Sequence, residues 1–197
     1  IVTAKLVINN QGRGDGAYGI EVADFAEGTY NRITGSDGRY YTLYMTNDAE
    51  VNSYHTGLKA SNGAVVIARQ NVELNVNGTK DAYGLEALSG AQIDIAGALQ
   101  ITTNGEAGAH VKGEDSNGQN SELSVANYIW VYTNADDAAG LIAEDGGKIN
   151  TTGEAATGEE INDNIARINT SGKNAHGIAV INNGEVNLKI GGVINTE

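Results

Sequence analysis

The sequence of 197 residues contains no cysteine and no proline. Without cysteine, the chain can form no disulfide, no thiolate zinc site and no thiol nucleophile. Large aromatic side chains are also scarce: there is one Trp (Trp130), one Phe (Phe25) and nine Tyr. Because a conventional globular core usually relies on more large aromatic side chains, we expect a core built from thin layers of Val, Ile, Leu and Ala.

Basic residues are in the minority. The chain has 12 Lys and Arg against 25 Asp and Glu, which gives a net charge of −13 and a pI of about 4.5. Double-stranded nucleic acid is a poor partner for such a chain, because there is no basic patch to release counterions. Anionic membrane surfaces are disfavoured for the same reason. We therefore predict no nucleic-acid partner.

Long apolar runs are missing as well. No stretch of about 20 apolar residues is present, so we predict no direct membrane insertion by this chain. No basic-then-apolar signal peptide opens the sequence, and residues 1–8 instead have the pattern of a strand already under way. We expect residues 1–197 to be one fragment of a longer protein, with any signal or anchor outside it.

Glycine, in contrast, is abundant at 27 residues. Six of these glycines open one recurring pattern: glycine, an apolar residue, any residue, then Ala or Val. The intervals between the six range from 24 to 38 residues, and self-similarity at this scale is typical of solenoids, propellers and arrays. The pattern occupies residues 19–22, 57–60, 84–87, 108–111, 140–143 and 177–180.

The flanks of the pattern predict short strands. In residues 72–77, apolar side chains alternate with polar ones, which places them on opposite faces of a strand. Gly or Asn-Gly corners separate three such stretches in each repeat, and both residue types tolerate a positive φ. No segment has helical periodicity. The sequence therefore predicts an all-β fold, a single parallel β-helix over residues 1–197 with three short strands per coil of about 24 residues and neighbouring coils ~4.8 Å apart.

Three stretches depart from the regular repeat and are expected to form loops that protrude from the stack. They are residues 23–41, 112–121 and 153–163.

Four segments carry a resemblance to a known family: the repeat units at residues 82–87 and 175–180, and the turns at residues 90–95 and 183–188. With these units, the chain resembles the passenger domain of a Gram-negative autotransporter, of the pertactin-like, self-associating adhesin type. The resemblance implies a right-handed β-helix at the cell surface, anchored by an outer-membrane barrel that lies outside this chain. It also implies adhesion or autoaggregation, since proteases of this family carry a separate catalytic module that we do not find here.

Two charged segments are candidate binding sites. Arg13-Gly14-Asp15 is an integrin-type tripeptide, although a turn with solvated charges explains it more simply. The acidic segment with Glu154, Glu159 and Glu160 offers carboxylates to a calcium ion, but it matches no calcium-loop pattern. A solvated acidic face is the favoured interpretation, and we predict no metal and no cofactor.

A third candidate is aromatic. Tyr128, Trp130 and Tyr132 alternate along the sequence and so share one face of a strand, while Ile129 and Val131 take the other. Because the aliphatic pair suits the core better, we expect an exposed aromatic strip that serves as a binding site.

The histidines and the charged repeat positions have no predicted catalytic role. His55, His110 and His176 occupy different places in the repeat, so we predict no metal or catalytic cluster. Glu21, Lys59 and Glu86 align at the third position of successive repeats. We expect an exposed column of alternating charge there, worth a few tenths of a kcal/mol per pair.

These observations predict a surface-exposed, non-enzymatic adhesin fragment that mediates cell–host or cell–cell adhesion by many weak contacts along the β-helix. Its partner would be a host-surface protein or glycan, or another copy of the chain. One alternative is a polysaccharide-active β-helix enzyme, a lyase or a tailspike-like hydrolase, which needs a carboxylate cluster on one flank that we do not find. Another is a purely structural stalk.

Overall fold

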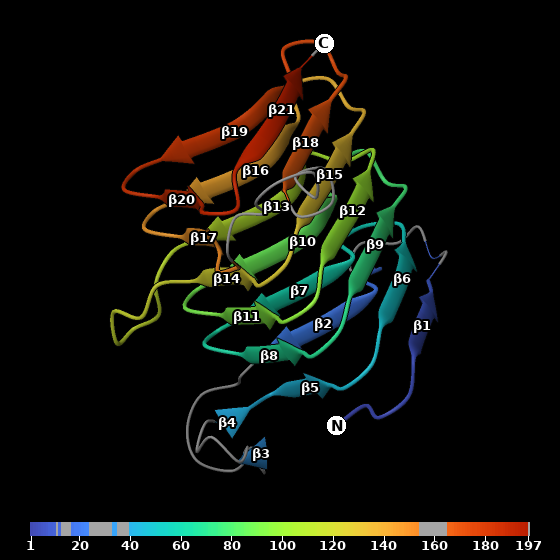
Figure 1. Cartoon of the computed structure of the whole chain (residues 1–197), viewed down its shortest axis with the longest axis vertical. Helices are drawn as coiled ribbons and strands as arrows, with labels where there is room; N and C mark the ends of the chain where they lie inside the picture. Colours follow the sequence, from blue (N-terminus) through green and yellow to red (C-terminus); the bar gives the residue numbers. More distant parts are fainter. Residues whose placement is uncertain (11, 13–16, 24–32, 35–39, 154–164, 197) are drawn as a thin grey trace.

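The computed structural model describes residues 1–10, 12, 17–23, 33–34, 40–153 and 165–196. These residues form β-strands and no helix, and almost all of the strands belong to three parallel sheets that run the length of the molecule (Figure 1). No helix in this part of the chain is long and apolar enough to cross a membrane.

The largest sheet, called the long sheet, has seven parallel strands that lie side by side in sequence order. From β6 onward, every third strand of the chain belongs to this sheet. They are β1 (Leu6–Asn9), β6 (Ala49–Ser53), β9 (Val72–Val76), β12 (Leu99–Thr103), β15 (Ile129–Thr133), β18 (Ala166–Thr170) and β21 (Gly192–Thr196).

The second sheet, called the glycine sheet, holds the recurring glycine pattern on six parallel strands. They are β2 (Ile20–Ala23), β7 (Leu58–Ser61), β10 (Tyr83–Leu88), β13 (Ala107–Lys112), β16 (Ala139–Glu144) and β19 (His176–Ile181).

The third sheet also has six parallel strands. They are β5 (Leu43–Met45), β8 (Val65–Ala68), β11 (Gln92–Ile95), β14 (Glu122–Val125), β17 (Lys148–Thr151) and β20 (Glu185–Leu188). Apart from these sheets, β3 (Ile33–Thr34) and β4 (Tyr40–Tyr41) form a short antiparallel pair within the predicted insertion at residues 23–41. Most of that insertion and of the one at 153–163 lies outside the described residues.

The chain visits the three sheets in turn. It passes from β9 in the long sheet to β10 in the glycine sheet and β11 in the third sheet, then returns to the long sheet at β12, beside β9. In Figure 1 the sequence colours rise through the stack from blue to red, one coil above the other. The predicted parallel β-helix with three strands per coil is confirmed.

The core is aliphatic, as the scarcity of aromatic residues predicts. Strands such as β9, β12 and β15 bury every second side chain. Leu74, Ile101 and Val131 lie in register in the long sheet and are fully buried. At about 25 cal/mol per Å² of apolar surface removed from water, such ladders of stacked side chains are the main source of stability.

The recurring glycine is explained by a close approach between two sheets. A Cβ atom on Gly108 would lie inside the volume of the Val131 side chain and 2.5 Å from the Gly140 carbonyl oxygen. Gly84 has the same relation to Ile101 and the Gly108 carbonyl. Every coil therefore needs a residue without a side chain where the glycine sheet begins, and this need produces the repeat.

The corners between the glycine sheet and the third sheet behave as predicted. Asn62 and Gly63 both have positive φ, at 55° and 73°, and Ser89 and Gly90 repeat this geometry one coil later. Two successive left-handed residues make a tight turn that Gly and Asn adopt at the lowest cost.

The predicted loop at residues 112–121 is present, but it is fastened to the neighbouring coil. The Gln119 side-chain amide donates to the Gly90 carbonyl at 3.0 Å, and the Gln92 amide donates to the Asn120 carbonyl at 2.7 Å. These two hydrogen bonds hold the loop against the stacked coils, so it contributes to the regular structure as well as protruding from it.

Candidate functional site

The outer face of the long sheet presents two columns of side chains, because each strand points alternate residues to solvent. Every second residue of these strands is buried, and the residues between them face outward. The first column consists of Val7, Glu50, Glu73, Gln100, Trp130, Arg167 and Val193. The second consists of Asn9, Asn52, Asn75, Thr102, Tyr132, Asn169 and Asn195.

The second column is an asparagine ladder. Asn52 donates its side-chain N–H to the Asn9 amide oxygen at 2.9 Å, and Asn75 donates in the same way to Asn52 at 3.1 Å. Asn195 and Asn169 repeat the contact at 2.7 Å near the other end of the stack. Amides that bond from coil to coil hold the outer surface in a fixed register.

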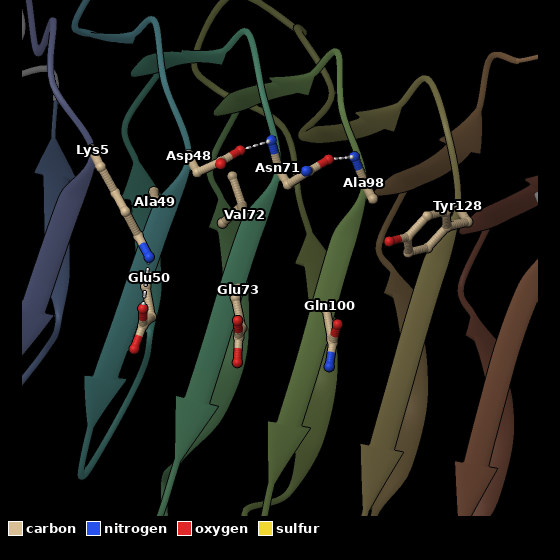
Figure 2. A pocket seen from close by; sticks show the side chains of 10 residues that line it. All are labelled: Lys5, Asp48, Ala49, Glu50, Asn71, Val72, Glu73, Ala98, Gln100 and Tyr128. Carbon is tan, nitrogen blue, oxygen red and sulfur yellow. Dashed lines mark hydrogen bonds and ion pairs between the residues drawn. The ribbon is translucent and has the colours of Figure 1, made fainter. Parts of the chain in front are cut away.

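A groove crosses the strands of the long sheet near their N-terminal ends. It has a volume of about 200 Å³ and extends from Lys5, beside β6, to Tyr128, just before β15. Figure 2 shows Glu50, Glu73 and Gln100 side by side along it, with the Tyr128 hydroxyl pointing toward β12. Small residues of the same strands, Ala49, Val72 and Ala98, complete its lining.

One edge of the groove is fixed by side chains that bond to the next turn. The Asp48 carboxylate accepts the backbone N–H of Asn71 at 3.1 Å. The Asn71 side-chain oxygen accepts the backbone N–H of Ala98 at 2.9 Å. Both bonds are visible in Figure 2. Because each turn is held by the coil before it, the groove is formed before any ligand arrives.

Glu50 and Glu73 are the carboxylates that accept side-chain hydrogen bonds along the groove. Lys5 Nζ lies 3.1 Å from Glu50 Oε2, and the Asn52 amide lies 3.5 Å from Glu50 Oε1. Hydrogen bonds from these two side chains, together with the positive charge of Lys5, lower the pKa of Glu50. Glu73 accepts one hydrogen bond, from Asn75 at 3.1 Å. A carboxyl group with a lowered pKa accepts hydrogen bonds well and is a poor general acid.

The aromatic strip lies at the end of this groove. Tyr128, Trp130 and Tyr132 are all at least partly exposed, and Ile129 and Val131 are fully buried, so the predicted orientation is confirmed. The Tyr128 and Trp130 rings stack with centroids 4.6 Å apart and planes at 32°.

Arg167 supports the strip from the next coil. Its guanidinium lies 5.5 Å from the centroid of the Trp130 ring, within cation–π range. Tyr128 therefore rests on Trp130, which is itself braced by Arg167, and the position of the Tyr128 ring is set by its neighbours.

Several polar groups at the groove have unused hydrogen-bonding capacity. Within the described residues, neither the Gln100 amide nor the Tyr128 hydroxyl makes a hydrogen bond. Each can both donate and accept. The Gln100 amide lies beside the Glu73 carboxylate, and Tyr128 lies on the other side of Gln100 (Figure 2), so the groove offers a ligand both acceptors and donors.

The sequence analysis found no carboxylate cluster on one flank, and the structure corrects that conclusion. Glu50 and Glu73 occupy the same register position on neighbouring strands. The signal was present in the sequence: residues 49–52 and 72–75 both read apolar, Glu, apolar, Asn. The glycine pattern does not point to this pair, because the glycines and the two Glu residues lie on different sheets.

A second cluster lies on the outer face of the glycine sheet. Glu21, Lys59 and Glu86 are in register there as predicted, and His110 continues their column. The expectation that this column is exposed is wrong for Glu86, which is only 8% exposed. Its neighbours Tyr83 and His110, whose rings stack 5.3 Å apart, help to cover it.

The cluster joins three coils. His110 Nε2 lies 3.2 Å from Glu144 Oε2, and its Nδ1 lies 3.9 Å from Glu86 Oε1. Lys112 Nζ lies 3.1 Å from Glu144 Oε1. No three His, Cys, Asp or Glu side chains of the described residues are placed to hold a metal ion. We interpret the cluster as a bridge between coils.

The Glu86 carboxyl is the member of this bridge that burial affects most directly. Burial raises its pKa, against the opposing electrostatic effects of Lys59 and His110 and a hydrogen bond from the Thr56 hydroxyl at 3.2 Å. The negative charge of Glu106 acts in the same direction as burial. The ionised form is therefore less favourable here than in water.

This shift predicts a dependence of stability on pH. The native state binds the Glu86 proton more tightly than the unfolded chain, so stability is lost as pH rises from about 4.3, the ordinary Glu value, to the raised native pKa. Glu86→Gln cannot ionise. Relative to the unsubstituted chain, we expect its free energy of unfolding to increase as pH rises through this window and to stay higher above it.

Urea denaturation at a series of pH values between about 4 and 8 measures this difference. Glu185→Gln, on the exposed side of β20, is the matched control. Equal pH profiles for the two variants would show that Glu86 is not the responsible group.

Two of the predicted sites lie outside the described residues: Arg13-Gly14-Asp15 and the acidic group of Glu154, Glu159 and Glu160. The structure brings together Tyr128 and Trp130 from the third predicted site with Glu50, Glu73 and Gln100, which the sequence analysis did not single out. In comparisons with known proteins, no family model, no curated protein and no solved structure matches this chain.

Proposed function

We propose that the chain is a non-catalytic adhesin, a rigid rod displayed at a bacterial cell surface that binds through the outer face of its long sheet. Its partner is a host-surface protein or glycan, or another copy of the chain. The observation that carries this proposal is the combination, on one regular face, of a preformed groove, an aromatic strip and unused polar groups. The resemblance to autotransporter passengers supports the location.

The regular face suits binding by many weak contacts. Outward side chains recur at the same register on every strand of the long sheet, about 4.8 Å apart. A ligand that follows the stack meets several of them at once. When many copies are presented together, such contacts add to an avidity far above the affinity of one site.

The groove carboxylates favour binding over catalysis. A glycosidase needs one carboxyl group with a raised pKa as its acid. Glu50 has a lowered pKa because Lys5 and Asn52 stabilise its ionised form. Among the described residues, Glu86 has a raised pKa, but it lies on the glycine sheet, away from the groove. This contrast supports the adhesin over a hydrolase that would use the groove as its active site.

Adhesion of coated beads tests the proposal. We expect beads that carry many copies of the chain to adhere to epithelial or bacterial cells, or to one another, and the soluble chain to bind weakly. Tyr128→Ala/Tyr132→Ala removes the outer aromatic groups and should reduce adhesion about tenfold or more, since central aromatic contacts are typically worth about 2 kcal/mol.

The control is Lys148→Ala/Asn187→Ala, which changes two partly exposed residues of the third sheet. It should adhere like the unsubstituted chain. Failure of coated beads to adhere to any cell or to each other would favour a structural stalk. Equal losses of adhesion in both double variants would indicate that the binding surface is not on the long sheet.

A further inference from the structure

We infer that the groove on the long sheet is a glycan-binding site, selective for neutral or amine-bearing sugars, with Tyr128 as the surface on which a sugar ring stacks. The inference rests on the proposed adhesin function and assigns it a ligand class. It is carried by three features of the groove: its polar groups, its aromatic end and the sign of its charge.

The polar groups match the hydroxyl pairs of a sugar. Glu73 offers carboxylate oxygens beside Gln100, whose amide offers both a donor and an acceptor and has no partner in the described part of the chain. Sugar hydroxyls donate and accept at once. Glu73 and Gln100, in register on neighbouring strands, can therefore hold two neighbouring hydroxyls.

Tyr128 supplies the apolar part of the site. Sugar rings have one face of C–H groups, and an aromatic ring offers a flat, weakly negative surface to such groups. Tyr128 lines the groove directly, and Trp130 lies behind it at 4.6 Å. Trp130 is therefore a positioning residue: it fixes the Tyr128 ring and lowers the entropy lost on binding.

The charge of the groove selects among glycans. Asp48, Glu50 and Glu73 line it against one Lys, Lys5, which is already paired with Glu50. Uronic, sialic or sulfated sugars would bring negative charge to these carboxylates and be repelled. Neutral sugars avoid this repulsion, and protonated amino groups are attracted.

The dimensions indicate a short stretch of a longer chain. The groove volume of about 200 Å³ is below the ~300–1,000 Å³ of pockets that enclose whole ligands. From Glu50 on β6 to Tyr128 beside β15 the groove crosses three strand spacings, about 14 Å in all. An oligosaccharide lying along the stack reaches the carboxylates and the aromatic ring together.

Ligand-observed NMR and calorimetry with defined tetrasaccharides test the inference. The probes are a cellulose tetramer and an N-acetylglucosamine tetramer as neutral chains, a glucosamine tetramer as the cationic chain and a galacturonate tetramer as the anionic one. We expect the neutral and cationic probes to bind and the anionic probe to bind at least about tenfold more weakly, if at all.

Variants assign the contacts. Tyr128→Ala should reduce the affinity about tenfold or more, and Tyr128→Phe should keep the stacking and lose only a few-fold. Glu73→Gln should reduce the preference for the cationic over the neutral probe. Trp130→Ala should weaken binding and Trp130→Phe restore most of it. Lys148→Ala/Asn187→Ala, on the third sheet, is the control, and thermal unfolding verifies that each variant is folded.

Absence of binding to all four probes would overturn the inference, as would a preference for the anionic probe or an affinity of Tyr128→Ala equal to that of the Lys148→Ala/Asn187→Ala control. These outcomes are separate from failure of the adhesin proposal. If coated beads adhere to cells after enzymatic removal of surface glycans but not after protease treatment, the adhesin proposal stands with a protein partner and the glycan inference fails.

Discussion

Gly108→Ala is expected to lower the free energy of unfolding by about 1–3 kcal/mol or more, although it adds a single methyl group. The new Cβ would enter the volume of Val131 and lie 2.5 Å from the Gly140 carbonyl oxygen. Neither neighbour can move cheaply, because Val131 is a fully buried member of the long sheet and the carbonyl belongs to the backbone of β16. Overpacking in well-packed cores costs this much.

The matched control is Gly192→Ala in β21. A Cβ there would meet the Ala166 carbonyl oxygen at 3.3 Å, and this glycine is exposed and has no positive φ. The 3.3 Å contact requires a small shift of the chain, which offsets the slight stabilisation that replacing a glycine usually brings by reducing the entropy of the unfolded chain. We therefore expect a change within about 0.5 kcal/mol. Urea denaturation of both variants measures the difference, and similar losses in both would mean that the repeat glycine is not set by the contact between sheets.

The fold was predictable from the sequence because the residues that produce it recur from coil to coil. The glycine marks one sheet, the alternation of residues 72–76 marks another, and the Asn62-Gly63 corner marks a turn between sheets. Each of these signals is local, and the stacking of coils then follows from the need of every coil to bury its inner face.

The candidate site was only partly predictable. Tyr128 and Trp130 were found because alternation along one strand is visible in the sequence. Their partners come from earlier strands: Gln100 lies 30 residues before Trp130, and Glu73 lies a further 27 residues before Gln100. Coils of unequal length hide such register, so residues that lie side by side in the long sheet have no constant spacing in the chain.

Burial of polar side chains was the other feature that the sequence did not reveal. Glu86 has the same place in the repeat as Glu21, which is exposed, yet it is almost completely covered. The difference arises from the neighbours: Tyr83 and His110 stack together beside Glu86. The chemistry of a position in a solenoid depends on the adjacent coils as much as on the repeat.

Leu141→Ala is expected to lower the free energy of unfolding by about 2–5 kcal/mol, the usual cost of a cavity left by a buried Leu. Leu141 is fully buried in β16, in register with Ala109 in the coil before it and Ile178 in the coil after it. Because Ala109 is already small, the coil before Leu141 has little side chain with which to fill the space. The loss should therefore exceed the lower end of that range.

Ile142→Ala provides the control within the same strand. Ile142 points to the opposite, outer face between His110 and Ala179 and is only partly buried, so we expect a loss below about 1.5 kcal/mol. In a stack, each coil is stabilised mainly by its neighbours. Hydrogen exchange should accordingly accelerate in β13, β16 and β19 of Leu141→Ala more than in the distant β7, whereas uniform acceleration would indicate that the rod unfolds as one cooperative unit.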